Sequence, residues 1–118
     1  MPAKLDPTAR FEPIELLRGT LDLLVLRCLV ASPLHGLGIS RRIAAMTRGA
    51  FDVKLGSLFL ALYRLEERGL VKAAWGESKT QQRAKFYELT ARGRRELEAE
   101  EAQWHWVALA MAQALESS

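Results

Sequence analysis

The sequence predicts a mainly α-helical chain with one small β-hairpin and a long C-terminal helix. Apolar residues recur at helical spacing in three segments before residue 70, and the apolar period then changes to two between residues 71 and 89. A second helical pattern of roughly 25 residues follows Thr90. With 118 residues the chain is long enough for one domain with its own core.

The N-terminal part predicts an arm followed by a first helix. Residues 1–14 contain Pro2, Pro7 and Pro13 without a periodic apolar pattern, which indicates a flexible arm. A helix is expected over 15–31, and its apolar residues cover nearly every side. Because such a helix needs cover on all sides, we expect a second subunit to contribute, with Leu21 and Leu24 at a dimer interface.

Two further helices are expected before residue 70. SPLHG ends the first helix, and Ile39, Ile43 and Met46 then mark a second helix that ends near Arg48 and Gly49. The third helix lies within GSLFLALYRLEERGL, residues 56–70, with Gly69 as its C-terminal stop. Its leucines 58, 62 and 65 share one face, whereas residues 59, 60 and 63 lie off it, which predicts a second face with a partner of its own.

The segment after Gly69 predicts a β-hairpin with a basic tip. Val71, Ala73 and Trp75 alternate with polar or small residues, and AKFYELT alternates again after the polar stretch GESKTQQR. Three helices followed by such a hairpin describe a winged helix-turn-helix domain over residues 15–89.

The last segment, residues 90–118, predicts a dimerisation helix capped by Thr90. Seven-residue spacing, which favours a partner helix, relates Leu97, Trp104 and Met111, and also Ala108 and Leu115. The alternative is that this helix folds back as a fourth core helix.

The charge is unevenly distributed along the chain. Residues 1–89 hold 14 Lys and Arg against 9 Asp and Glu, whereas residues 90–118 hold 3 against 5. A basic front and an acidic tail fit a surface that binds a polyanion, although surface charge also serves solubility.

A helix-turn-helix that places its second helix in the major groove of double-stranded DNA reads bases from the N-terminal half of that helix. The residues that fit these contacts are Ser57, Phe59, Leu60, Tyr63 and Arg64 of the third helix, Arg41 of the second, and Lys79, Arg83 and Lys85 of the hairpin. Alternatively, Arg64 lies beside Arg68 or Glu67 as part of a solvated face, and Phe59 and Leu60 pack against the first or last helix.

Four segments together resemble the PadR family of transcriptional regulators over about residues 16–97. They are LLRGTLDLLVLRCL, LHGLGISRRI, GSLFLALYRLEERGLVKAAWGES and QRAKFYELTARGRREL. The resemblance implies a winged-helix dimer, generally a repressor, that binds palindromic operators through a recognition helix opening at residues 56–63. Phe59 and Leu60 replace the Tyr-Pro usual in the family, and Leu37 replaces a usual Tyr. The loss of a phenol hydroxyl at position 59 implies weaker or altered operator binding.

The resemblance also implies a site for a small effector. In some PadR-like proteins a tryptophan of the last helix lines a cavity at the dimer centre and stacks on flat apolar effectors, and Trp104 matches it by position. Packing is the alternative role for Trp104. His105 is read as an exposed helix residue, and His35 as a residue that caps or orients the turn before the second helix.

Several classes of protein are excluded by the residues present. One Cys and two distant His give no metal-ligand spacing, and there is no phosphate-binding Gly-rich loop or nucleophile elbow. We therefore expect no enzyme, no metal and no cofactor. Apolar runs are too short for a membrane span and no signal-like segment opens the chain, so a cytoplasmic location is expected, with Cys28 as a buried apolar residue.

Two functions remain from different classes. The first is a sequence-specific DNA-binding repressor that acts as a homodimer on an inverted repeat and is relieved by a small apolar or aromatic effector. The second is a winged-helix docking module that buries Phe59, Leu60 and Tyr63 against a partner protein.

Overall fold

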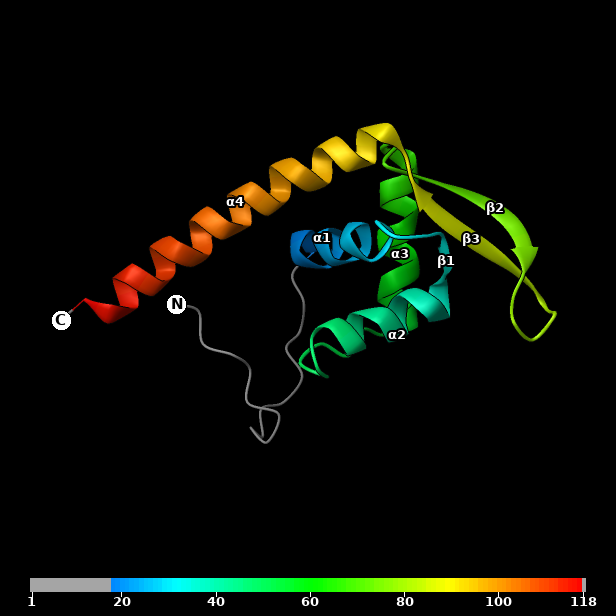
Figure 1. Cartoon of the computed structure of the whole chain (residues 1–118), viewed down its shortest axis with the longest axis horizontal. Helices are drawn as coiled ribbons and strands as arrows, with labels where there is room; N and C mark the ends of the chain where they lie inside the picture. The colour runs from blue at the N-terminus through cyan, green and yellow to red at the C-terminus, as the bar shows by residue number, and fades with distance from the viewer. Residues whose placement is uncertain (1–17, 118) are drawn as a thin grey trace.

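The computed structural model of the chain describes residues 18–117, which form four helices and three strands. In chain order these are α1 (Arg18–Cys28), β1 (Leu34–His35), α2 (Gly36–Met46), α3 (Leu55–Glu67), β2 (Val71–Glu77), β3 (Arg83–Leu89) and α4 (Ala91–Glu116). The β2–β3 hairpin and the far end of α4 extend in opposite directions from α1, α2 and α3 (Figure 1). The mainly α fold with a winged helix-turn-helix and a C-terminal helix is confirmed. The predicted arm over 1–14 and the predicted helix start at Glu15 lie outside the described residues.

Helix α1 is the centre of the core, and its cover comes from the same chain. Val25, Leu26, Cys28 and Leu29 are fully or almost fully buried, and α1 packs against α2, α3 and α4. Leu21 is also buried in this core, so its assignment to a dimer interface was wrong: α3 and α4 supply the cover that we had expected from a second subunit. Leu24 is partly buried against the same core.

Helices α2 and α3 form the helix-turn-helix, and each has a clear local cause. The ring of His35 caps α2, since its Nδ1 accepts a hydrogen bond from the amide of Gly38 at 3.0 Å, as expected for this residue. Ile39 and Ile43 are buried on the inner side of α2. Helix α3 ends where Gly69 adopts a φ of +72°, with the amides of Gly69 and Leu70 bonded to carbonyls of the last turn.

The strands form an antiparallel sheet in the order β1-β3-β2. The predicted hairpin is confirmed, with Val71 opposite Leu89 at its base and Glu77 opposite Arg83 near its tip. Strand β1 was missed, because a two-residue strand is too short to show an alternating pattern. It pairs Leu34 with Tyr87 and His35 with Phe86, and so ties the start of α2 to the wing.

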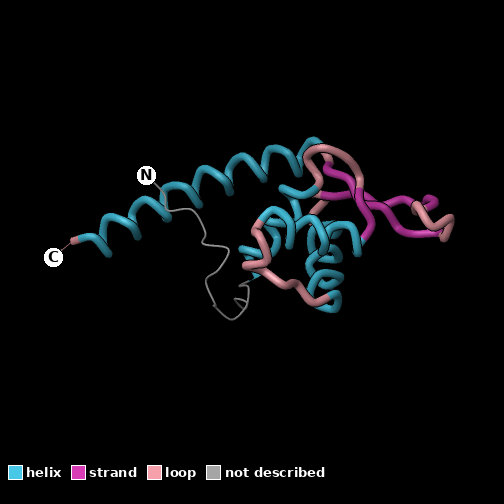
Figure 2. Tube along the Cα trace, turned by 60° about the horizontal axis from the view of Figure 1, so that its bottom comes forward, coloured by secondary structure: helices cyan, strands magenta, loops and turns pink. Residues whose placement is uncertain are grey.

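Helix α4 belongs to the core only at its beginning. Thr90 caps it as predicted, accepting a hydrogen bond from the Gly93 amide at 2.9 Å. Leu97 is buried against the core, so its assignment to a dimer interface was wrong for the same reason as for Leu21. From Ala102 to Ser117 all residues are exposed, and Figure 2 shows this half of α4 clear of the other helices. The fold-back alternative is therefore right for the first turns of α4 and wrong for the rest.

Replacing Gly93 with alanine should destabilise the fold. The first turn of α4 lies directly against the backbone of Leu70, and an added methyl group would collide with the Leu70 carbonyl oxygen. We expect the free energy of unfolding to fall by about 2 kcal/mol, as is typical of overpacking, in urea denaturation followed by circular dichroism. Gly56→Ala is the matched control, since nothing lies within 4 Å of the added carbon. Equal stability of the two variants would contradict the close contact.

Candidate nucleic-acid interface

Helix α3 has one buried face and one exposed face. Leu58, Ala61, Leu62 and Leu65 are completely or almost completely buried. On the other side Phe59 is 49% exposed, and Leu60 and Tyr63 are each 64% exposed. Ser57 is exposed in the first turns of the same helix. Burial of each leucine stabilises the fold by about 2 kcal/mol, so the inner face fixes the helix and leaves the outer face available to a partner.

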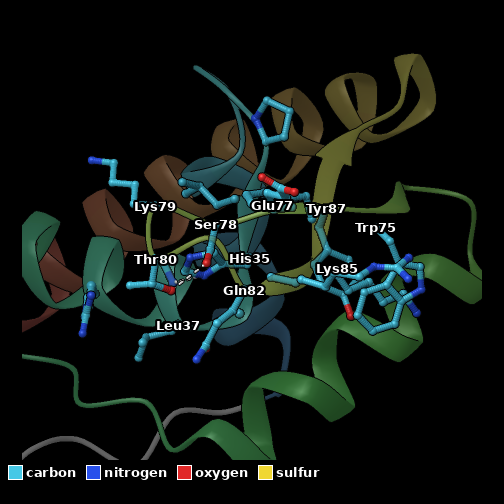
Figure 3. A pocket seen from close by; sticks show the side chains of 18 of the residues that line it. His35, Leu37, Trp75, Glu77, Ser78, Lys79, Thr80, Gln82, Lys85 and Tyr87 are labelled. Atoms are coloured by element: carbon cyan, nitrogen blue, oxygen red, sulfur yellow. Dashed lines mark hydrogen bonds between the residues drawn. The ribbon is translucent and has the colours of Figure 1, made fainter.

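A concavity of about 1060 Å³ lies between the wing and the start of α2. Figure 3 shows it, with Lys79 and Trp75 at its two ends and His35 and Leu37 between them. Of the predicted contact residues, those that line it are Arg41, Phe59, Lys79, Arg83 and Lys85. Ser57, Leu60 and Tyr63 lie outside this lining, on the exposed face of α3. The structure thus groups the predicted residues into two neighbouring surfaces, one on α3 and one between α2 and the wing.

Phe59 joins these two surfaces by packing on Gly36. A Cβ atom added to Gly36 would lie 2.8 Å from Cε1 and Cζ of the Phe59 ring, so only glycine permits this approach. The packing alternative for Phe59 is thus right in kind, but its partner is the start of α2 rather than the first or last helix. Phe59 as a whole is still about half exposed.

Two lysines of the wing differ in their surroundings: Lys79 is exposed, whereas Lys85 is paired with a carboxylate. Lys79 is exposed at the tip, where the amide of Ser78 donates to the carbonyl of Gln82 at 2.9 Å and closes the turn. The Lys85 ammonium lies 3.7 Å from a carboxylate oxygen of Glu66 and 5.7 Å from the centre of the Tyr87 ring. Lys85 thus lines the concavity while it also ties the wing to α3.

Arg64 does not belong to the exposed face. Its Nη2 donates to Oδ1 of Asp22 at 2.8 Å, and the two side chains are only 25% and 10% exposed. The expected DNA contact of Arg64 was therefore wrong, and so was the alternative of a solvated group beside Glu67 or Arg68. Asp22 is a buried charged residue of α1, and a buried carboxylate requires a partner.

A second group of charges continues this contact toward α4. Arg68, the C-cap residue of α3, donates to Glu96 of α4 at 3.3 Å. Burial raises the pKa of the neighbouring Glu100, and its hydrogen bond with Glu96 and the negative charges of Glu96 and Asp22 raise it further, whereas Arg68 lowers it. The charge cluster of Asp22, Arg64, Arg68, Glu96 and Glu100 therefore connects α1, α3 and the base of α4.

Cys28 is buried, and burial raises the pKa of its thiol to about 11. Because the thiolate is the reactive form, this supports the interpretation of Cys28 as a core residue. In residues 18–117 no group of three or more His, Cys, Asp or Glu side chains is arranged to hold a metal ion. None of the helices in this range is both long and apolar enough to cross a membrane.

Most residues that line the concavity were not predicted as part of the site, among them His35, Leu37 and Trp75. His35 and Leu37 enter the concavity because β1 holds the start of α2 against β3. Trp75 lies on β2 and is 63% exposed. The sequence did contain a signal for Trp75: a large aromatic residue stands in a short strand next to the polar, basic tip of the hairpin. A residue that serves only packing is unusual at such a position.

Comparison with known proteins gives a consistent result. The Transcriptional regulator PadR-like family matches residues 25–99. A PadR family transcription regulator from Clostridium difficile is 30% identical, with 80% of this chain and 97% of that chain covered and a TM-score of 0.70. A second from Eggerthella lenta is also 30% identical, with 86% of each chain covered and a TM-score of 0.71. Bacillus subtilis PadR, solved in complex with operator DNA, has a similar fold at 23% identity, with 67% of this chain and 46% of that chain covered and a TM-score of 0.60.

Replacing Arg64 with methionine should destabilise the protein, because the Asp22 carboxylate would stay buried without a partner. We expect a loss of about 2 kcal/mol in the free energy of unfolding, measured by urea denaturation. In a double-mutant cycle, Asp22→Asn should remove most of the further effect of the Arg64 change, giving a coupling of about 1.5 kcal/mol. Arg68→Met is the control, since its pair with Glu96 is more exposed and should contribute under about 1 kcal/mol. Additive effects at positions 22 and 64 would refute this role of Arg64.

Proposed function

The chain belongs to the Transcriptional regulator PadR-like family, and on that premise we propose that it is a repressor that binds an inverted-repeat operator in double-stranded DNA as a homodimer. The single observation that carries the proposal is the position of the exposed face of α3 beside a concavity flanked by Arg41, Lys79, Arg83 and Lys85. The similar fold of Bacillus subtilis PadR, solved with its operator DNA, supports it further.

In this proposal the exposed face of α3 enters the major groove. The Ser57 hydroxyl binds a phosphate, Tyr63 binds a phosphate or a base edge, and Phe59 and Leu60 press on thymine methyl groups. Phe59 can offer only part of its ring, because Cε1 and Cζ lie against Gly36. Arg41, Lys79, Arg83 and Lys85 then meet the DNA beside this groove from α2 and the wing.

The dimer is proposed to form through α4, so that residues 90–118 serve dimerisation and residues 15–89 bind DNA. Trp104, Ala108, Met111 and Leu115 are all exposed on the free half of α4, and a second copy would cover them. A two-fold dimer presents two equivalent α3 helices, so the half-sites of the operator should lie about one helical turn apart. A cytoplasmic location is part of this proposal.

A small apolar or aromatic effector is proposed to act at Trp104, which is 50% exposed. The base of α4 is joined to α3 through Arg68 and Glu96 and to the core through Leu97. A ligand that changes the angle between the two α4 helices would therefore change the separation of the two α3 helices, and so lower operator affinity.

Removing a cation from the concavity should lower the affinity for DNA and make that affinity less dependent on salt concentration. For Arg41→Ala and Lys79→Ala we expect about a tenfold loss of affinity at low salt, as for a charge-assisted hydrogen bond, and a salt slope smaller by about one. Fluorescence anisotropy with a labelled duplex that the protein itself selects from random sequence measures both quantities. The control is Lys72→Ala, because Lys72 lies on the opposite side of the wing and pairs with Glu88 at 3.2 Å. Absence of DNA binding at low salt, or binding that ignores salt, would count against the proposal.

Charged substitutions on the free half of α4 should separate the subunits. For Met111→Glu and Leu115→Glu we expect monomers in sedimentation velocity at micromolar concentration, because each carboxylate would be buried against the second copy. His105→Glu adds the same charge on the side of α4 that carries Glu98 and Glu116, and should leave the dimer intact. A wild-type protein that sediments as a monomer would overturn the proposed assembly.

A further inference from the structure

The wing carries an exposed aromatic residue that the contacts proposed so far do not use. Trp75 stands on β2 directly opposite Lys85, and Glu77 stands opposite Arg83. Two residues that pair across antiparallel strands lie on the same face of the sheet. Residues separated by two positions along one strand also share a face. Trp75, Glu77, Arg83 and Lys85 therefore share one face of the hairpin, and all four line the concavity. Figure 3 labels the first two and Lys85.

Arg83 rests on this tryptophan. The carbon at the centre of its guanidinium lies 5.5 Å from the centroid of the Trp75 ring, a cation-π arrangement. Within residues 18–117, Arg83 takes part in none of the five ion pairs closer than 4.0 Å, although Glu77 stands directly across from it. By contrast, Lys72 and Lys85 of the same hairpin are paired with Glu88 and Glu66. Trp75 thus orients the guanidinium of Arg83, and no carboxylate of the described residues lies close enough to neutralise its charge.

A guanidinium held against an indole is suited to the minor groove of A·T-rich DNA. A guanidinium is planar and more weakly hydrated than an ammonium, so it loses less when it leaves bulk water. The indole also restricts the long side chain before any ligand binds, which lowers the entropic cost of binding. The narrow minor groove of A·T-rich DNA concentrates negative potential and attracts such groups, whereas the 2-amino group of guanine obstructs the floor of the groove.

We propose that Arg83, held against Trp75, reads the minor groove that flanks each operator half-site and selects A·T-rich sequence there. The inference rests on the proposed function, because a wing beside α3 reaches the flanking groove only when the exposed face of α3 lies in the major groove. Arg83 makes the contact, and Trp75 is a positioning residue that acts through Arg83. The wing then adds specificity in addition to charge.

The experiment compares three flanking sequences in one operator. The wild-type protein and Arg83→Lys select binding sites from random duplex DNA in parallel, and the recovered site is then made with A·T, G·C or inosine·C pairs in the flank. Inosine·C keeps the major-groove pattern of G·C but lacks the 2-amino group in the minor groove. Affinities are measured by fluorescence anisotropy at one salt concentration, and salt slopes are measured on the A·T duplex.

For the wild-type protein we expect about tenfold tighter binding to the A·T flank than to the G·C flank, in the range found for one mismatched base pair. Inosine·C should bind like A·T. Arg83→Lys should keep the salt slope, because the charge remains, but lose the preference for A·T in both assays. Trp75→Ala should lose most of the preference with Arg83 intact, whereas Trp75→Phe, which keeps an aromatic face, should retain part of it. Lys72→Ala should retain all of it.

The outcomes separate this inference from the function on which it rests. If Arg83→Ala weakens binding to all three duplexes equally, Arg83 contacts a phosphate and the inference is overturned while operator binding stands. A wild-type protein that does not distinguish the flanks has the same consequence. Failure of the wild-type protein to bind any duplex at low salt would overturn the inference and the proposed function together. Circular dichroism of each variant confirms that the fold is unchanged.

Discussion

The burial of one face of α3 is the constraint on which the rest of the structure depends. Leu58, Ala61, Leu62 and Leu65 pack against α1, α2 and the base of the hairpin, and Arg64 adds a short contact to the buried Asp22. A helix fixed on one side by both apolar packing and a charge pair cannot rotate about its axis without exposing leucines or separating that pair. The direction of its outer face is therefore set by the core, and this face is the one proposed to meet DNA.

The wing is held by contacts of residues Lys85, Phe86 and Tyr87 of β3, whereas its tip is free to contact a partner. Strand β3 lies between β1 and β2, so the sheet holds the hairpin to the start of α2 on one edge. Lys85 and Glu66 add a link to α3. These contacts involve no residue of β3 beyond Lys85, and the concavity lies between the hairpin and the start of α2 (Figure 3). Cations from separate parts of the chain are brought together in this way.

Helix α4 combines two environments in one continuous element. Its first turns are held by the Thr90 cap, by the close approach of Gly93 to Leu70 and by the burial of Leu97. Its second half is exposed and carries large apolar side chains such as Trp104 and Met111. Because a helix transmits a change of direction along its length, the charge cluster between α1, α3 and α4 is where a change at the far end would reach α3. This connection is the physical basis for the regulation proposed above.

The sequence by itself determined the elements, because their signals are local. Periods of 3.6 and 2, the Thr90 cap and the stop at Gly69 depend on residues close together in the chain, and they predicted α2, α3, α4 and the hairpin nearly to their ends. The outer face of α3 was likewise visible as residues off the leucine face.

Only the tertiary structure decided which partner each side chain meets. Arg64 donates to Asp22, which lies 42 residues away in the sequence. Leu21 and Leu97 are buried in the core of their own chain. Arg83 lies over the ring of Trp75. Such contacts depend on how the helices and strands pack in space, and no local pattern of residues encodes that packing.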